Sequence, residues 1–518
     1  MPVKEELGTI LVLDFGGQYC HLIARRIREF NVYSEIIPFD ITLEELETVR
    51  KRVGAKGLVL SGGPSSVYGQ DAPTVDPFIL NMGIPVLGLC YGHQLIAYLT
   101  SGKVKQGSKQ EYGITYVTVT KPVGVLEDLD RKEKVWMSHG DTVQKLADDY
   151  EILAYTENCP VAAFRHKQKP IYGLQWHPEV VHTEHGNEML RNFVFKVCGC
   201  QPNWKPSSIV DEQVNEMKRT VGGGKAIIAL SGGIDSSTAA VIASRALGQN
   251  LTAVFVDHGF MREGEPEFVE ETFGKLGVKV IVANASDRFF GKLKGVVEPE
   301  EKRRVIGNEF IRVFEEEAKR TGAEFLIQGT IYPDRIESGF RKHSDKIKSH
   351  HNVAGLPTDM QFKAVIEPLR DLYKDEVRKL AKTLGLPGSI TRRQPFPGPG
   401  LAVRVIGEVT PEKVELVRKA EKIVSEEVEK AGLQDGLWQY FAVLTDTKST
   451  GVKGDSRAYG YVVAVRAVES REAMTASFAK ISFDVLERIS TRITNELPLV
   501  TRVVYDVTHK PPATIEWE

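Results

Sequence analysis

The sequence predicts two doubly wound α/β domains with mostly parallel sheets, followed by a small α+β C-terminal domain. Short apolar runs alternate with amphipathic segments, several glycine-rich turns directly follow such runs, and two proline-containing stretches interrupt the pattern. The 518 residues suffice for two to four domains with their own cores. The expected domains are 1–200, 201–397 and 398–518.

Composition excludes several classes of protein. A net charge of −2 favours neither nucleic acid nor membrane as a partner. The N-terminus has no apolar signal core, and no apolar run is long enough to span a bilayer. The few scattered cysteines predict no disulfide framework, so a cytoplasmic protein is expected; they are Cys20, Cys90, Cys159, Cys198 and Cys200.

In the first domain, strands are expected over 9–14, 32–37, 57–60 and 85–89, and helices from 19 to about 30 and over 94–99. The stretches FGGQ, SGGP and LCYGHQ fall where three of these strands end. Ligands of parallel sheets bind beyond the carboxyl ends of the strands. A site is therefore expected at this edge.

Cys90 is the candidate nucleophile. Gly88 and Gly92 flank it in the pattern of a sharp strand-to-helix turn, and a helix N-terminus favours a reactive thiolate. A buried structural cysteine is the alternative. Further along, His177 and Glu179 stand two residues apart in QWHPE, so the carboxylate can orient an imidazole that acts on the thiol.

The motifs GGQ, SGGP, GLCYGHQ, SHGD and QWHPE resemble the class I glutamine amidotransferases. The resemblance implies that Cys90 attacks the glutamine carboxamide and that His177 protonates the departing ammonia. The backbone amides of Gly63 and Tyr91 are then the expected oxyanion hole. The residues expected to hold glutamine are Gln94 and the turn formed by Ser138, His139, Gly140 and Asp141.

A second motif lies in KAIIALSGGIDSST, residues 225–238. A buried strand over 226–230 and a helix from Ser237 onward would leave several backbone N–H groups facing outward, which makes an anion site. An ordinary glycine-rich turn is the alternative, and the spacing differs from a Walker A loop. Asp235 among phosphate-binding amides indicates a Mg²⁺ ion. The expected ATP-binding residues here are Ser231, Gly232, Gly233, Ile234, Asp235, Ser236 and Ser237.

SGGIDSS resembles the loop of ATP pyrophosphatases, which split ATP into AMP and pyrophosphate while adenylating a substrate. Strands are expected over 251–257, 278–283 and 325–328, and helices over 209–220, 267–276 and 300–320. The resemblance implies that Val256 and Asp257 pass the adenine and ribose. The basic segment 335–352 is either a solvated loop or a lid that brings Lys348 to the polyphosphate.

After a proline-rich turn at 393–401, the C-terminal domain is expected to contain helices over 411–431 and 483–496 and strands over 441–444, 461–465 and 501–507, with GVKGDSR (451–457) as a loop. Composition alone assigns it no function. GVKGDSR and KPPATIEWE resemble the GMP synthetases, and this resemblance covers essentially the whole chain. Gln394 and His258 depart from the family pattern and receive no role.

This resemblance implies the substrates XMP, ATP and glutamine, and a homodimer formed through the C-terminal domain. Lys510 and Arg457 suit a 5′-phosphate, and Glu516 suits a base or ribose donor. Arg303 is alternatively a surface charge paired along its helix. The full set of expected XMP-binding residues is Arg303, Gln439, Asp455, Arg457, Lys510 and Glu516, some of which can act across the dimer interface.

Three other functions remain open from the sequence. Another glutamine-dependent ATP pyrophosphatase would share both motifs but would not need the C-terminal tail. A regulatory protein with an inactive amidotransferase module would be expected to have lost a residue such as Cys90 or Asp235. A stand-alone thiol hydrolase would leave SGGIDSS unexplained.

Overall fold

A computed structural model describes residues 8–334, 362–470 and 475–518. The basic segment 335–352, including Lys348, lies outside the described residues. The chain forms two compact units, Met1–Lys205 and Pro206–Glu518. None of the helices in the described ranges has the length and apolar character needed to cross a membrane.

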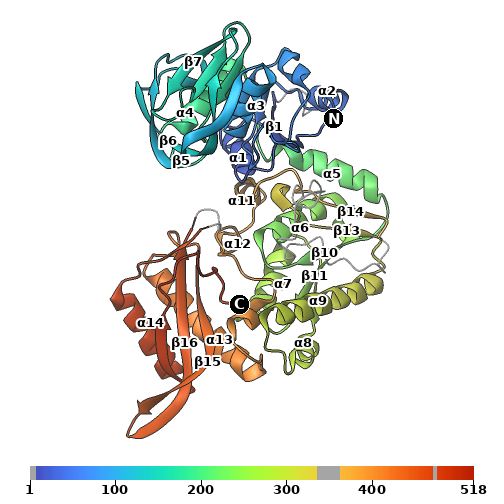
Figure 1. The fold of residues 1–518 in the computed structure, drawn as a ribbon. Helices are drawn as coiled ribbons and strands as arrows, with labels where there is room; N and C mark the ends of the chain where they lie inside the picture. Colours follow the sequence, from blue (N-terminus) through green and yellow to red (C-terminus); the bar gives the residue numbers. More distant parts are fainter. Residues whose placement is uncertain (1–7, 335–361, 471–474) are drawn as a thin grey trace. The chain divides into compact units, whose positions relative to one another are not determined.

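The first unit is built on a nine-stranded sheet of order β2-β1-β3-β4-β9-β8-β7-β5-β6 (Figure 1). Its first five strands are parallel: β1 (Ile10–Asp14), β2 (Ser34–Pro38), β3 (Gly57–Leu60), β4 (Val86–Leu89) and β9 (Ile171–Leu174). The helices of this unit are α1 (Cys20–Glu29), α2 (Leu43–Val53), α3 (Tyr91–Leu99) and α4 (Gly186–Arg191).

The other half of this sheet is antiparallel, a feature that the sequence analysis did not resolve. It consists of β5 (Lys103–Val119), β6 (Lys132–Lys145), β7 (Tyr150–Tyr155) and β8 (Ala163–His166). The strands of the parallel half have buried residues on both faces, as expected for a sheet covered by helices.

The second unit begins with a parallel sheet of order β12-β11-β10-β13-β14. The strands are β10 (Ala226–Leu230), β11 (Leu251–Asp257), β12 (Val280–Asn284), β13 (Phe325–Ile327) and β14 (Ala364–Ile366). The associated helices are α5 (Ser208–Val221), α6 (Ile234–Leu247), α7 (Glu265–Lys275), α8 (Ser286–Leu293), α9 (Pro299–Thr321), α11 (Lys374–Thr383) and α12 (Gly388–Thr391).

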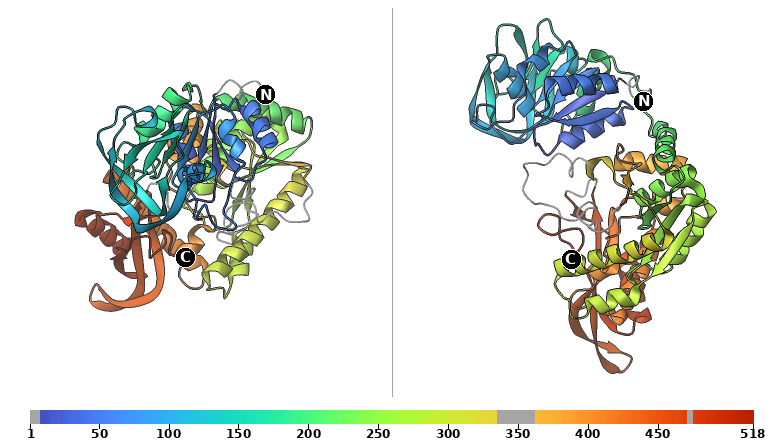
Figure 2. Two further views of the ribbon diagram at one scale, coloured as in Figure 1. Left: turned by 45° about the horizontal axis from the view of Figure 1, so that its top comes forward. Right: turned by 90° about the vertical axis from the view of Figure 1, so that its right-hand side faces the viewer.

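The C-terminal part carries a four-stranded mixed sheet with two helices, α13 (Pro411–Lys430) and α14 (Phe483–Glu496). Its strands are β15 (Gln439–Lys453), β16 (Ser456–Glu469), β17 (Ser477–Phe478) and β18 (Val500–Tyr505). The expected loop at 451–457 is instead the tip of a hairpin: β15 and β16 are long antiparallel strands, and the turn between them is confined to Gly454–Asp455 (Figure 2).

One hydrophobic core joins the parallel sheet to this C-terminal part. It contains Ile227 and Val254 from the parallel sheet together with Val417 and Ile489 from α13 and α14. The two parts on either side of residue 397 therefore share one core. Both belong to the compact unit Pro206–Glu518. The fold class is confirmed: two α/β parts with large, parallel-rich sheets and a small α+β part.

Candidate active sites

Cys90 stands at the turn between β4 and α3, with φ 52° and ψ −101°. Such a backbone is strained for a residue other than glycine and occurs at functional sites. A Cβ at Gly88 would lie 2.4 Å from the carbonyl oxygen of Gly92, and one at Gly92 would lie 2.3 Å from that of Leu60. Only glycine fits on either side of the nucleophile. The turn therefore has the geometry expected from the sequence.

His177 and Glu179 form a buried pair beside this turn. The Nδ1 atom of His177 lies 2.6 Å from Oε1 of Glu179. Burial opposes protonation of the ring, but the charges of Glu179 and Cys90 outweigh it, and the pKa of His177 lies well above its ordinary value. The Cys90 thiol also points to the carbonyl oxygen of Ser138, at 3.5 Å. The arrangement suits a thiolate–imidazolium pair.

The loop that follows β3 packs closely against this pair. A Cβ at Gly62 would come within 3.2 Å of the His177 ring and 3.7 Å of the Cβ of Cys90, and one at Gly63 would lie 2.8 Å from the carbonyl oxygen of Phe15. Tyr91 is the first residue of α3, so its amide belongs to the unsatisfied first turn of the helix. Both expected oxyanion-hole residues therefore lie close to the nucleophile.

The segment Ser138–Asp141 is part of strand β6, and the expected turn is wrong. Gln94 secures this strand, because its Nε2 donates to the backbone oxygen of Asp141 at 2.8 Å. His139 is buried and lies 3.1 Å from Glu111, a residue that the sequence analysis missed. Gly140 continues the same strand. A lone acid in β5 carries no sequence signal for this pairing, because it depends on the strand register.

In the second unit, the predicted anion loop joins β10 to α6. Gly232 has φ +70°, and Gly233 is the N-cap of a helix that begins at Ile234, three residues earlier than expected. The side chains of Ser231 and Ser236 lie 3.0 Å apart, and Ser237 donates to the Gly233 carbonyl at 2.6 Å. The loop places the amides of the first turn of α6 at the carboxyl edge of the sheet.

Asp235 lies in the first turn of α6 and pairs through Oδ2 with Lys374, which begins α11. Its Oδ1 is buried and has no hydrogen-bond partner among the described residues. A buried carboxylate oxygen without a donor fits a cation ligand, so the site is compatible with Mg²⁺. The sequence analysis did not identify Lys374, which lies 139 residues further along the chain.

Val256 and Asp257 end the adjacent strand β11. The Val256 side chain is fully buried in the core, so only its main chain can face a nucleotide. Asp257 accepts from the amide of Gly259 at 2.9 Å and thereby shapes the following loop. His258 is buried against Phe260, and burial lowers the pKa of its ring to about 4. It is a neutral core residue.

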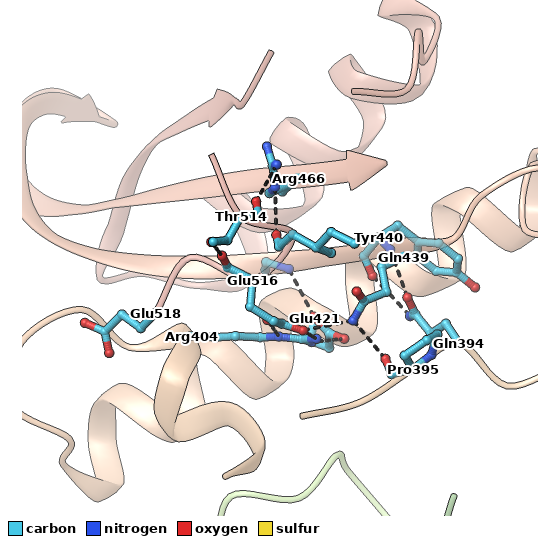
Figure 3. A network of polar contacts seen from close by, with 12 residues as sticks. Gln394, Pro395, Arg404, Glu421, Gln439, Tyr440, Arg466, Thr514, Glu516 and Glu518 are labelled. Carbon is cyan, nitrogen blue, oxygen red and sulfur yellow. Dashed lines mark hydrogen bonds and ion pairs between the residues drawn. The ribbon is translucent and has the colours of Figure 1, made fainter. Parts of the chain in front are cut away.

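Two of the residues expected to bind XMP lie together in the C-terminal part (Figure 3). Gln439 donates through Nε2 to Oε1 of Glu516 at 2.9 Å. Arg404, missed by the sequence analysis, holds both carboxylate oxygens of Glu516, at 2.9 and 3.1 Å, and pairs with Glu421 at 2.8 Å. Arg404 is fully buried, whereas the side chain of Glu516 keeps 18% of its exposure. The Glu516 side chain thus remains partly accessible to a ligand.

Gln394 has a structural role that its departure from the family pattern did not suggest. Its side-chain oxygen accepts from the Tyr440 amide at 2.8 Å, and its Nε2 donates to the Tyr440 carbonyl at 3.1 Å. In return, Gln439 donates to the Pro395 carbonyl at 3.0 Å. These reciprocal bonds fix the proline-rich segment to the start of β15 (Figure 3).

Arg303 lies in α9 and contacts Glu518, and Lys510 lies in the C-terminal segment that leads to Glu518. Arg303 donates to the backbone oxygen of Glu518 and lies 3.5 Å from Glu300 one helical turn away, which is the pairing along the helix expected of a surface charge. Its neighbour Lys302 is buried and pairs with the Glu518 side chain. The backbone amide of Lys510 donates to Ala476 at 2.8 Å.

Asp455 and Arg457 are not brought to Glu516. They lie at the turn of the β15–β16 hairpin, whereas Gln439 begins β15 and pairs with Val468 at the opposite end. At a strand rise of about 3.3 Å per residue, the two ends are roughly 45 Å apart. One chain therefore cannot place both groups around one nucleotide.

Comparisons with known proteins agree with this arrangement. The family model for glutamine amidotransferase class-I matches residues 11–197, that for the PP-loop domain matches 206–387, and that for the GMP synthase C terminal domain matches 426–517. The chain is 54% identical over 511 residues, 98% of its own length and 99% of the relative's, to the GMP synthase [glutamine-hydrolyzing] of Caldicellulosiruptor saccharolyticus. Identity to the protein of the same name in Symbiobacterium thermophilum is 52% over 519 residues, with both chains covered completely.

Fold and sites therefore define a glutamine amidotransferase joined to an ATP-using PP-loop domain. With full-length relatives above half identity, the chain belongs to the family of glutamine-hydrolysing GMP synthases, which are ligases with glutamine as the amide donor. The expected family is confirmed.

Proposed function

We propose that this chain converts XMP, ATP, glutamine and water into GMP, AMP, pyrophosphate and glutamate. The main support is that one chain combines the Cys90–His177–Glu179 arrangement with the anion loop that precedes α6. Membership of the GMP synthase family supplies the acceptor. The chemistry needs both sites, because a purine carbonyl oxygen leaves only after adenylation and ammonia must then displace AMP.

In the first unit, the Cys90 thiolate attacks the carboxamide carbon of glutamine. The protonated His177, oriented by Glu179, gives its proton to the departing ammonia, and water then hydrolyses the thioester to release glutamate. The amides of Gly63 and Tyr91 stabilise the tetrahedral oxyanion. We assign glutamine binding to the residues beside Cys90: Gln94, Ser138, His139, Gly140 and Asp141.

In the second unit, the amides of Ser231–Ser237 bind the pyrophosphate of ATP. Asp235 would hold the Mg²⁺ ion through Oδ1, and the ion would neutralise the phosphate charge when bound. The main chain of Val256 and the Asp257 loop receive the adenosine. Glu516, positioned by Gln439, accepts hydrogen bonds from the base or ribose of XMP, and we assign the cationic contacts to XMP to Arg303 and Lys510. Lys348, outside the described residues, is assigned to the polyphosphate of ATP.

The distance between the hairpin turn and Glu516 supports a homodimer. We assign Asp455 and Arg457 to the XMP site of a second copy, because their own site is roughly 45 Å away. The distal half of the hairpin also exposes apolar side chains, with Val452 at 74% and Tyr459 at 72%. The chain carries free cysteines, including the nucleophile, which suit a reducing compartment, so we place the enzyme in the cytoplasm.

The test separates the two nitrogen sources. Wild-type protein with ATP, Mg²⁺ and XMP should form equimolar AMP and GMP from either glutamine or ammonium, as measured by chromatography. Cys90→Ala should lose glutamine-dependent synthesis and retain ammonium-dependent synthesis. Wild-type protein that forms no AMP in the presence of XMP would refute the acceptor, and Cys90→Ala that still uses glutamine would refute the nucleophile.

A further inference from the structure

Arg262 lies on the loop between β11 and α7, at the edge of the parallel sheet where ligands bind. Strand β11 is hydrogen-bonded to β10, which carries the anion loop at its end. The Arg262 guanidinium packs over the ring of Phe396 at 4.2 Å. Phe396 belongs to the proline-rich segment that Gln394 fixes to β15. Arg262 therefore stands beside both the anion loop and the acceptor part of the unit.

The Nη2 atom of Arg262 is buried and, within residues 8–334, 362–470 and 475–518, has no hydrogen-bond partner. The charged groups around it are Arg393, Arg404, Glu265 and Glu421. Burial, and then the charge of Arg393, lower the pKa of Arg262 to about 10. The group is still charged at neutral pH, so its Nη2 is a buried cationic donor without an acceptor in the described part of the chain.

The neighbouring carboxylates are already occupied by the other arginines. Arg393 holds both oxygens of Glu265 at 2.5 Å. Glu421 accepts from Arg404 at 2.8 Å through one oxygen and from the Ala442 amide at 3.0 Å through the other. These ion pairs leave the Arg262 donor available for an anion that the described part of the chain does not supply.

The positions of these arginines indicate which anion that is. Arg393 also donates to the carbonyl of Gly232 in the anion loop, at 3.3 Å, and Arg404 holds Glu516. Arg262 lies close to both and shares the Phe396 ring with Arg404, whose guanidinium is 5.2 Å from its centre. When ATP and the acceptor are bound, the anionic group that lies between the pyrophosphate and the acceptor base is the α-phosphate of ATP.

Building on the proposed function, we propose that Arg262 binds the non-bridging oxygens of this α-phosphate during adenylyl transfer. In that step, the acceptor oxygen forms a bond to the α-phosphorus, the bond to the bridging oxygen breaks, and pyrophosphate leaves with that electron pair. Negative charge gathers on the non-bridging oxygens as the bonds exchange. A guanidinium, with paired donors in one plane, stabilises it without a proton transfer.

The test uses the full-length protein with ammonium as nitrogen source and measures XMP-dependent AMP release. Arg262→Ala should lower kcat about 100-fold while the KM for XMP changes less than about threefold, and added guanidinium chloride should restore part of the rate. Arg262→Lys should keep a kcat between those of Arg262→Ala and the native protein, because an ammonium lacks the paired donors of a guanidinium.

Arg418→Leu is the matched control. Arg418 donates from α13 to the carbonyls of Met261 and Gly259, at 3.0 and 2.5 Å, and so supports the same loop without offering it a free donor. It should lower the melting temperature but reduce kcat less than tenfold, without guanidinium rescue. Equal losses of kcat in Arg262→Ala and Arg418→Leu, or no rescue of Arg262→Ala, would overturn the proposal.

A second overturning outcome concerns the source of the phosphate. If Arg262→Ala raises the KM for XMP and leaves kcat unchanged, the residue binds the 5′-phosphate of XMP instead. Wild-type protein serves as the reference for the function itself: if it releases no AMP with XMP present, the proposed function fails independently of Arg262.

Discussion

The guanidinium of Arg404 binds both carboxylate oxygens of Glu516, whose side chain stays partly exposed. Both oxygens of the carboxylate accept from the guanidinium, and the arginine is anchored in turn by Glu421 (Figure 3). Burial opposes the charge, but the two glutamates outweigh it and raise the pKa of Arg404 above its ordinary value. The guanidinium of Arg404 therefore stays charged, and the orientation of Glu516 depends on its two parallel donors.

From this pair we expect a selective effect on the acceptor. Glu516→Gln keeps the shape but loses the charge, and hydrogen bonds to charged groups contribute about 1.5–3 kcal/mol, so the KM for XMP should rise roughly 10- to 100-fold. Arg404→Lys should act in the same direction through misplacement of Glu516. The measurement is ammonium-dependent GMP formation at varied XMP, with Arg492→Lys as the control, because Arg492 lies in α14 and pairs with Glu496 instead of with Glu516. An unchanged KM for XMP in both variants would contradict the assignment.

The triad predicts a change in pH dependence. Glu179 and Cys90 hold the pKa of His177 above its ordinary value against the effect of burial, so the imidazolium persists as pH rises towards that raised pKa. Glu179→Gln removes one of these charges, which lowers the pKa of His177 and moves the alkaline limb of glutamine hydrolysis to lower pH. The rate near pH 8 should fall roughly 100-fold.

The profile is measured as glutamate release between pH 6 and about 10, the range that brackets a histidine with a raised pKa. Ammonium-dependent synthesis in the same variant should be unaffected, because His177 has no role in it. A lower rate with an unmoved alkaline limb would show that Glu179 only orients the ring.

How far the sequence predicts the structure depends on how many residues separate the interacting groups along the chain. The strands Ala226–Leu230 and Leu251–Asp257 were predicted with the observed limits, because an uninterrupted apolar run suits a strand buried on both faces. The sequence pattern predicts that α6 starts at Ser237, whereas the helix starts at Ile234 because Gly233 is its N-cap. Such local features are encoded within a few residues.

Interactions between distant segments carried no such signal. The hairpin over 439–469 was missed in its middle, because glycines and charged residues of an exposed hairpin resemble a loop. Arg404 and Lys374 were missed because their partners, Glu516 and Asp235, lie 112 and 139 residues away in sequence. Cys90 could be predicted as the nucleophile because Gly88 and Gly92 stand only two residues from it in the sequence.

Asp235 provides a test of the metal site. Asp235→Asn removes the charge from a buried oxygen that accepts from no donor in the described ranges, so synthesis from glutamine and from ammonium should both fall at least about 100-fold. Any residual activity should need more Mg²⁺ for half-saturation than the wild type. Glutamine hydrolysis measured alone should continue, since the first unit contains the complete triad. Unchanged Mg²⁺ dependence with reduced activity would refute this residue as the ligand.

The hairpin predicts complementation between subunits. If Arg457 acts in the site of a second copy, a chain with Arg457→Ala and a chain with Glu516→Gln are each impaired as homodimers. In a heterodimer of the two, both changes fall in one site and the other site is intact. Heterodimers isolated with two different affinity tags should therefore show about half the wild-type activity. Within one chain, Arg457 lies at the turn of the hairpin and Glu516 lies beside Gln439 at its other end, roughly 45 Å away. Failure to complement would mean that both residues act in one site of the same chain, and it would refute the shared site.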